Sequence, residues 1–183
     1  MSKFKLNSIS EILIYKPSTK FNKSKISSNS IYIFSFTLGL ISSVLLSFSL
    51  KILFLIFIWL SFYLYLLAKY TSKLEEKNYK KNLKKSIILN EIVVSFIMIG
   101  FYLKYPHFGI MYLFYLTGII ISLYSSSKES LVFPNKFENF LVFTLMILVP
   151  NYIFFILGLF NLFIFYRGFK SLYKEFFTKK EID

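Results

Sequence analysis

Three long apolar blocks alternate with lysine-rich segments along this chain. The blocks cover residues 31–68, 87–125 and 140–166. A helix needs about 20 apolar residues to cross the roughly 30 Å hydrocarbon core of a bilayer. The first two blocks are therefore each long enough for a pair of spanning helices. This pattern predicts an all-α fold, a polytopic integral membrane protein built as a helical bundle.

Breaks within the blocks predict six transmembrane helices arranged as three hairpins. Lys51 interrupts the first block, Pro106 interrupts the second, and Pro150 provides a turn in the third, because proline ends or kinks a helix. The transmembrane domain is expected over residues 31–166, with spans at 31–50, 52–68, 86–103, 109–124, 134–149 and 151–166. The alternative is five spans, in which residues 140–166 form one long kinked helix.

The charge distribution favours six spans over five. With six spans, 20 of the 22 basic residues lie on one side of the membrane, and only Lys51 and Lys104 lie on the other. With five spans the split becomes 15 against seven. Basic residues beside spans concentrate on the cytoplasmic side, so both termini are predicted to be cytoplasmic. There the lysines are expected to meet anionic lipid headgroups.

The polar segments complete the expected domain organisation, and all of them are predicted to be cytoplasmic. They are an N-terminal tail (1–30), a lysine-rich loop (69–85) and a basic amphipathic C-terminal tail (167–183). Within the first tail, Ser8 and Glu11 have the spacing of a capping box. We expect a short helix there, lying in the membrane interface, which Pro17 stops.

Small residues at four-residue spacing mark one face of two predicted spans. They are Ser35, Gly39, Ser43 and Ser47 in the first span and Gly118 and Ser122 in the fourth. Small side chains let a second helix approach closely, and hydroxyls can form hydrogen bonds between helices. The stripes predict packing within the bundle or, alternatively, contact with a partner membrane protein or a second copy of the chain.

Glu91, preceded by Asn90, lies about one helical turn inside the third predicted span. Carboxylates inside a membrane are costly, and they often mark an ion or proton pathway. The position is also close to the cytoplasmic boundary, where a solvated or paired glutamate would need no such role. We interpret Glu91 and Asn90 as candidates for an intramembrane functional site, with the interfacial glutamate as the alternative.

The residue inventory argues against catalysis and against a bound cofactor or metal. The chain has no Cys, one Asp at its end (Asp183), one His (His107) and one Arg (Arg167). Thiol chemistry needs Cys, aspartyl chemistry needs paired Asp, and a single His cannot build a zinc site without carboxylate or thiolate partners. The net charge is +13, but the basic residues lie beside apolar spans, so we expect no nucleic-acid binding either.

Three functions fit these expectations. The favoured one is a membrane-embedded subunit of a transport or assembly complex. Its layout of an interfacial N-terminal helix, small outer loops and a charged inner loop is similar to permease subunits of export-type ABC systems. The second is a stand-alone membrane interaction or immunity protein that acts through contacts between helices. The third is a small ion-coupled carrier that uses Glu91.

Overall fold

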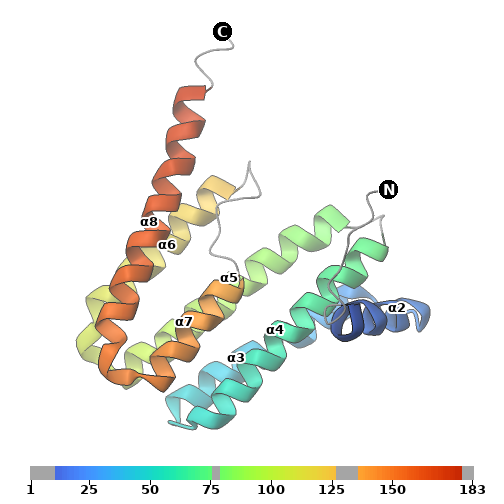
Figure 1. Cartoon of the computed structure of the whole chain (residues 1–183), viewed down its shortest axis with the longest axis horizontal. Coiled ribbons are helices and arrows are strands. Elements are labelled where there is room, and N and C mark those ends of the chain that lie inside the picture. The colour runs from blue at the N-terminus through green and yellow to red at the C-terminus, as the bar shows by residue number, and fades with distance from the viewer. Residues whose placement is uncertain (1–10, 76–78, 127–135, 179–183) are drawn as a thin grey trace. The chain divides into compact units, whose positions relative to one another are not determined.

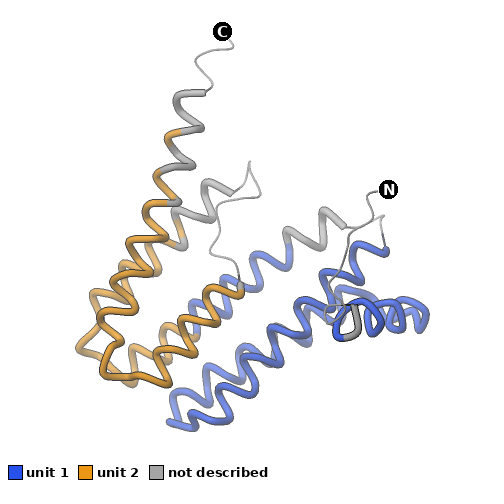
Figure 2. Tube along the Cα trace, in the orientation of Figure 1, with its two compact units in different colours: residues 1–96 blue, residues 97–183 orange. Residues whose placement is uncertain are grey.

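The computed structural model describes residues 11–75, 79–126 and 136–178, and every element in this part of the chain is helical (Figure 1). The chain divides into two compact units, residues 1–96 and 97–183 (Figure 2). The helix α5, Tyr79–Lys104, begins in the first unit and ends in the second. The all-α prediction is therefore confirmed for the described residues.

The first unit is built around the hairpin of α3 (Ser28–Ser47) and α4 (Lys51–Leu74). Ser27 caps α3, because its side-chain oxygen accepts a hydrogen bond from the N–H of Ser30 at 3.2 Å. Ser49 closes the hairpin with a left-handed φ of 64°. This turn lies immediately before Lys51, at the predicted break in the first apolar block.

The N-terminal helix does not stop where proline was expected to stop it. A π-helical turn, η1 (Glu11–Tyr15), leads directly into α2 (Lys16–Lys23), so this prediction is wrong. Pro17 lies in the first turn of α2, where backbone N–H groups have no helical partner and the missing N–H costs nothing. Ser8 of the predicted capping box lies outside the described residues.

The lysine-rich segment 69–85 is also more helical than expected. The helix α4 continues to Leu74 and α5 begins at Tyr79, so most of the predicted loop belongs to two helices. The segment contains neither Gly nor Pro and is rich in Lys, Leu and Glu, which are good helix formers. Charge therefore indicated the edge of the apolar spans but not the ends of the helices.

The second unit contains two helical hairpins, each turning at a proline. The end of α5 leads through a 3₁₀ turn, η2 (Pro106–Phe108), into α6 (Gly109–Ser126). The helix α7 (Lys136–Leu148) leads through η3 (Pro150–Tyr152) into α8 (Ile153–Thr178). The chain bends by 116° at this second turn, so residues 140–166 do not form one continuous helix.

Three helical segments of the described chain are long and apolar enough to cross a membrane. They are Ser28–Ser47, Lys51–Leu74 and Lys85–Lys104, and the bent pair of α7 and α8 makes a fourth if it counts as one span. Many large apolar side chains on these helices are exposed, including Ile52, Phe96 and Leu162. Such surfaces are typical of helices that face lipid and are compatible with a membrane location.

Candidate functional site

A reciprocal pair of serines joins α3 to α4 in the first unit. The Ser35 hydroxyl donates to the backbone carbonyl of Ser61 at 2.7 Å, and the Ser61 hydroxyl donates to that of Ser35 at 2.8 Å. Both side chains are fully enclosed. Small side chains allow the two backbones to come this close, so Ser35 acts here in helix packing.

The next two members of the predicted stripe contact the first part of α5. A Cβ atom added to Gly39 would lie 2.6 Å from Val93 Cγ1, a distance at which the two atoms would overlap. The Ser43 hydroxyl donates to the carbonyl of Phe96 at 2.7 Å. Ser47 is exposed, and its hydroxyl donates back to the carbonyl of Ser43 at 3.3 Å. The stripe thus packs α3 against two neighbours through three of its four residues.

The second stripe lies where α6 meets α8. A Cβ atom at Gly118 would lie 2.6 Å from Ile164 Cγ2, so only glycine allows this approach. Asn161 of α8 donates from Nδ2 to the carbonyl of Met111 in α6 at 3.1 Å. The side chain of Ser122 lies outside the described residues. Close packing and one polar contact therefore hold α6 and α8 together.

Asn90 and Glu91 are adjacent and both buried on α5, with 7% and 5% of their surface exposed. Asn90 Nδ2 donates to Glu91 Oε1 at 3.2 Å. The Ser95 hydroxyl donates to the backbone carbonyl of Glu91 at 2.9 Å. From Lys85, where the apolar part of α5 begins, Glu91 lies about 9 Å further along the helix axis. This pair is a buried polar site at the edge of an apolar segment.

A buried carboxylate can take up and release a proton, which is the chemistry that a proton pathway requires. A metal ion would need a larger cluster of ligands. Among the described residues, no group of three His, Cys, Asp or Glu side chains is placed to hold a metal ion. The single histidine, His107, is exposed in η2.

Two polar contacts between helices were not predicted from the sequence. Glu75 at the end of α4 binds the first turn of α3: Oε1 accepts the N–H of Ser28 at 2.7 Å, and Oε2 accepts its hydroxyl at 2.5 Å. A carboxylate is favoured at a helix N-terminus, where backbone N–H groups are unpaired. In the second unit the Tyr115 hydroxyl donates to Asn139 Oδ1 at 2.7 Å. Both contacts join distant segments, which sequence spacing alone does not bring together.

The small and polar residues predicted on the apolar helices therefore have two kinds of surroundings. Ser35, Gly39, Ser43 and Gly118 lie where helices pack closely, whereas Asn90 and Glu91 form a buried pair with an ionisable carboxyl group. No protein-family model, curated protein or solved structure matches this chain.

Proposed function

We propose that the chain is a non-enzymatic, membrane-embedded subunit of a transport or assembly complex. In this proposal it has six spans in three hairpins and both termini on the cytoplasmic side. The charge split of 20 basic residues against two supports that topology. The short α7, at 13 residues and about 20 Å, would be accommodated by local thinning of the bilayer.

The likeness of the two proline turns supports the third hairpin. Tyr105 before η2 has φ −133° and ψ 66°, and Val149 before η3 has φ −128° and ψ 66°. Each N–H bonds back to the preceding helix, Tyr105 to the carbonyl of Phe101 at 2.8 Å and Val149 to that of Leu145 at 2.9 Å. The same backbone conformation and hydrogen bond thus end both α5 and α7, which favours two equivalent hairpins.

The two hairpins also pack side by side. Phe101 of α5 lies against Phe143 of α7, with ring centroids 5.9 Å apart, and Phe108 of η2 lies 6.4 Å from Phe154 of α8. The two turns therefore lie at the same end of the second unit (Figure 1). With both turns at one end of the unit, both would lie on the same side of the membrane, as the proposed six spans require.

The observation that carries the subunit proposal is the way α2 packs. The Tyr63 hydroxyl of α4 donates to the carbonyl of Leu13 at 2.9 Å, and the buried Ser18 hydroxyl lies 3.4 Å from the carbonyl of Leu67. Ile14 and Phe21 pack against a cluster that includes Leu67. The inward face of α2 is therefore occupied by the protein itself and not by lipid.

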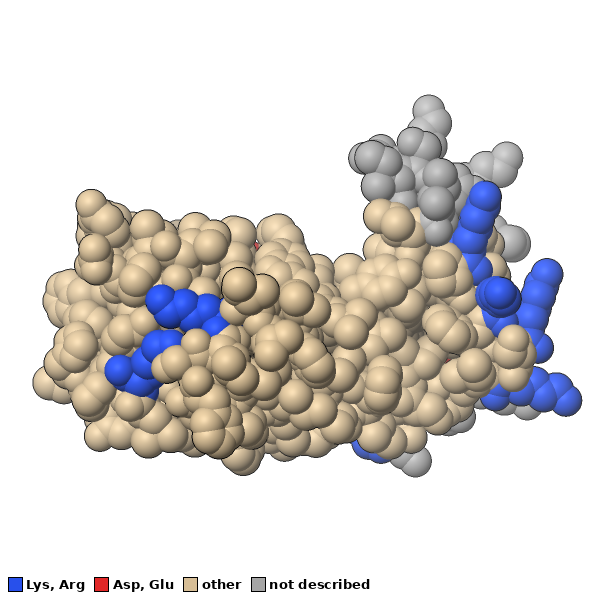
Figure 3. Space-filling view, turned by 90° about the horizontal axis from the view of Figure 1, so that it is seen from below, with Lys and Arg blue, Asp and Glu red and all other residues tan. Residues whose placement is uncertain are grey.

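The outward face of this N-terminal segment carries four exposed lysines, which we call the lysine ledge. They are Lys16, Lys20, Lys23 and Lys25. Figure 3 shows basic side chains projecting where α2 lies. A helix that served only as a lipid anchor would place its apolar face among headgroups. Here Ile14, Ser18 and Phe21 pack against the protein, so the lysine ledge faces outward and is suited to an acidic cytoplasmic partner.

Purification from the native membrane in mild detergent, followed by mass spectrometry, tests the proposal. We expect a stoichiometric partner, and we expect it to be lost when Lys16, Lys20 and Lys23 are all changed to Glu. Lys51→Glu at the α3–α4 turn is the matched control and should keep the partner. A chain that purifies alone would contradict the subunit proposal, and a partner retained equally by both variants would contradict the role of the lysine ledge.

The buried Asn90–Glu91 pair favours a second candidate, a small ion-coupled carrier. Glu91→Gln keeps the shape of the side chain but removes its charge, so it should abolish proton flux into vesicles that contain the purified protein. Glu138→Gln in the first turn of α7 is the control. Flux that is absent in the unchanged protein, or equal in Glu91→Gln, would exclude this candidate.

A further inference from the structure

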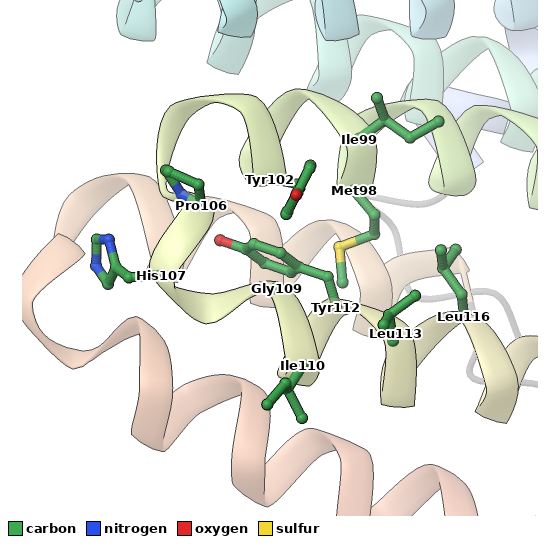
Figure 4. Close-up of a pocket in the computed structure, with 10 residues that line it drawn as sticks. All are labelled: Met98, Ile99, Tyr102, Pro106, His107, Gly109, Ile110, Tyr112, Leu113 and Leu116. Atoms are coloured by element: carbon green, nitrogen blue, oxygen red, sulfur yellow. The ribbon is translucent and has the colours of Figure 1, made fainter.

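A pocket of about 560 Å³ lies within the first hairpin of the second unit, between the end of α5, η2 and the start of α6 (Figure 4). Its apolar wall includes Met98, Ile110, Leu113 and Leu116. Ile110 and Leu113 are exposed, so the pocket lies on an accessible, apolar flank of the hairpin. The volume is within the roughly 300–1,000 Å³ of typical small-molecule sites.

Glycine at position 109 keeps this space open. A Cβ atom there would lie 3.0 Å from Tyr102 Cε2, so a larger side chain would press on the Tyr102 ring and occupy the pocket. Aligning Pro106 with Pro150 places Ile153 at the equivalent position of the second hairpin, and that side chain is fully buried. The same backbone turn is therefore filled in one hairpin and hollow in the other.

The pocket also contains a polar atom that the described protein does not satisfy. Tyr112 is only 3% exposed, and its hydroxyl has no hydrogen-bond partner among the described residues. Figure 4 shows that the hydroxyl points along the pocket toward Pro106 and the turn. A buried hydroxyl without a partner costs about 1–3 kcal/mol. A ligand oxygen at this position would remove that cost.

We propose that this pocket binds one apolar chain of a membrane lipid or a related amphiphile. The tail would lie against Met98, Leu113 and Leu116, and an ester or carboxyl oxygen of the head would accept the Tyr112 hydrogen bond. The polar head would then lie at the turn, beside the exposed His107. Apolar depth with one hydrogen-bond donor toward the turn is the arrangement that an amphiphile requires. This site is independent of the subunit role proposed above.

Photo-crosslinking of the full chain in detergent micelles tests this proposal. Two diazirine probes are used, palmitic acid and a phosphatidylcholine that carries the diazirine in its acyl chain. Crosslinks are mapped by mass spectrometry. We expect enrichment within residues 98–116 with at least one probe, and the better probe identifies a free acid or a phospholipid as the source.

Two variants and one control decide the result. Gly109→Ile copies the second hairpin and should abolish the enrichment, whereas Tyr112→Phe should reduce it several-fold through loss of one hydrogen bond. Gly158→Ile is the matched control, because no atom lies within 4 Å of a Cβ added there. If Gly109→Ile fails to fold, Tyr112→Phe alone carries the test. Crosslinking spread evenly over the apolar helices, or unchanged by the variant that folds, would overturn the proposal.

Discussion

The two hairpins of the second unit have turns of the same backbone conformation, but they differ in the side chains that occupy the space beside the turn. Around η3, Ile153 is fully buried beneath the turn, whereas Gly109 takes the corresponding place after η2. Phe143 and Met146 in α7 are buried, but the aligned residues in α5, Ile99 and Tyr102, are exposed. The same backbone turn can therefore lie beside a buried isoleucine or beside a pocket next to a glycine, so the backbone of the turn does not decide how tightly a hairpin packs.

The largest expected effect on stability comes from removing the buried side chain beside the turn of the second hairpin. Ile153→Ala removes a fully buried side chain and should lower the free energy of unfolding by about 2–5 kcal/mol, through lost burial and the cavity left behind. Titration of the purified protein in micelles with sodium dodecyl sulfate measures this change. A loss below about 0.5 kcal/mol would mean that the second hairpin is not tightly packed and would remove the contrast.

Overfilling the contact between α6 and α8 should have a smaller effect. Gly118→Val puts a Cβ atom 2.6 Å from Ile164 Cγ2 and should destabilise the protein by about 1–3 kcal/mol. The control is Gly158→Val in α8, where an added Cβ meets open space and the stability should change little. Equal effects of the two substitutions in the same titration would show that α6 and α8 do not pack as described.

Two tyrosines of α6 give the smallest and most discriminating test. Tyr115→Phe removes the hydroxyl that donates to the buried Asn139 and should cost about 1 kcal/mol, the usual contribution of one hydrogen bond to stability. Tyr112→Phe removes a hydroxyl without a partner and should leave stability within about 0.5 kcal/mol or raise it. A reversed order in thermal unfolding would contradict the assignment of partners.

Much of the helical layout could be predicted from the sequence, because its causes are local. Lys51, Pro106 and Pro150 mark the turns, since a proline cannot lie in the interior of a regular helix and a lysine within a long apolar block favours the membrane surface. Pro17 was misread because its effect depends on its position within the helix, and the first turn tolerates it. The segment 69–85 was misread because charge says little about where a helix ends.

The candidate sites were less predictable, because they depend on contacts between distant segments. Four-residue spacing puts Ser35, Gly39 and Ser43 on one face of a helix, and in the structure these residues contact α4 and α5. It could not identify Ser61 as the partner, nor the pairing of Tyr115 with Asn139. The pocket exists because Gly109 has no side chain. The sequence shows the glycine but not the residues around it, so it could not reveal the pocket.

The proposed six-span topology, with its three turns on one side of the membrane, is tested most directly by labelling single cysteines, because the chain has no Cys of its own. Lys51, His107 and Asn151 lie at the three turns and are exposed, and Lys20 and Tyr173 are exposed near the two ends. Each is changed to Cys and treated with a membrane-impermeant maleimide. The proposed topology predicts that the three turn positions react in intact cells and that the two end positions react only after permeabilisation. Labelling of Tyr173→Cys from outside, with Asn151→Cys protected, would establish five spans and contradict the account.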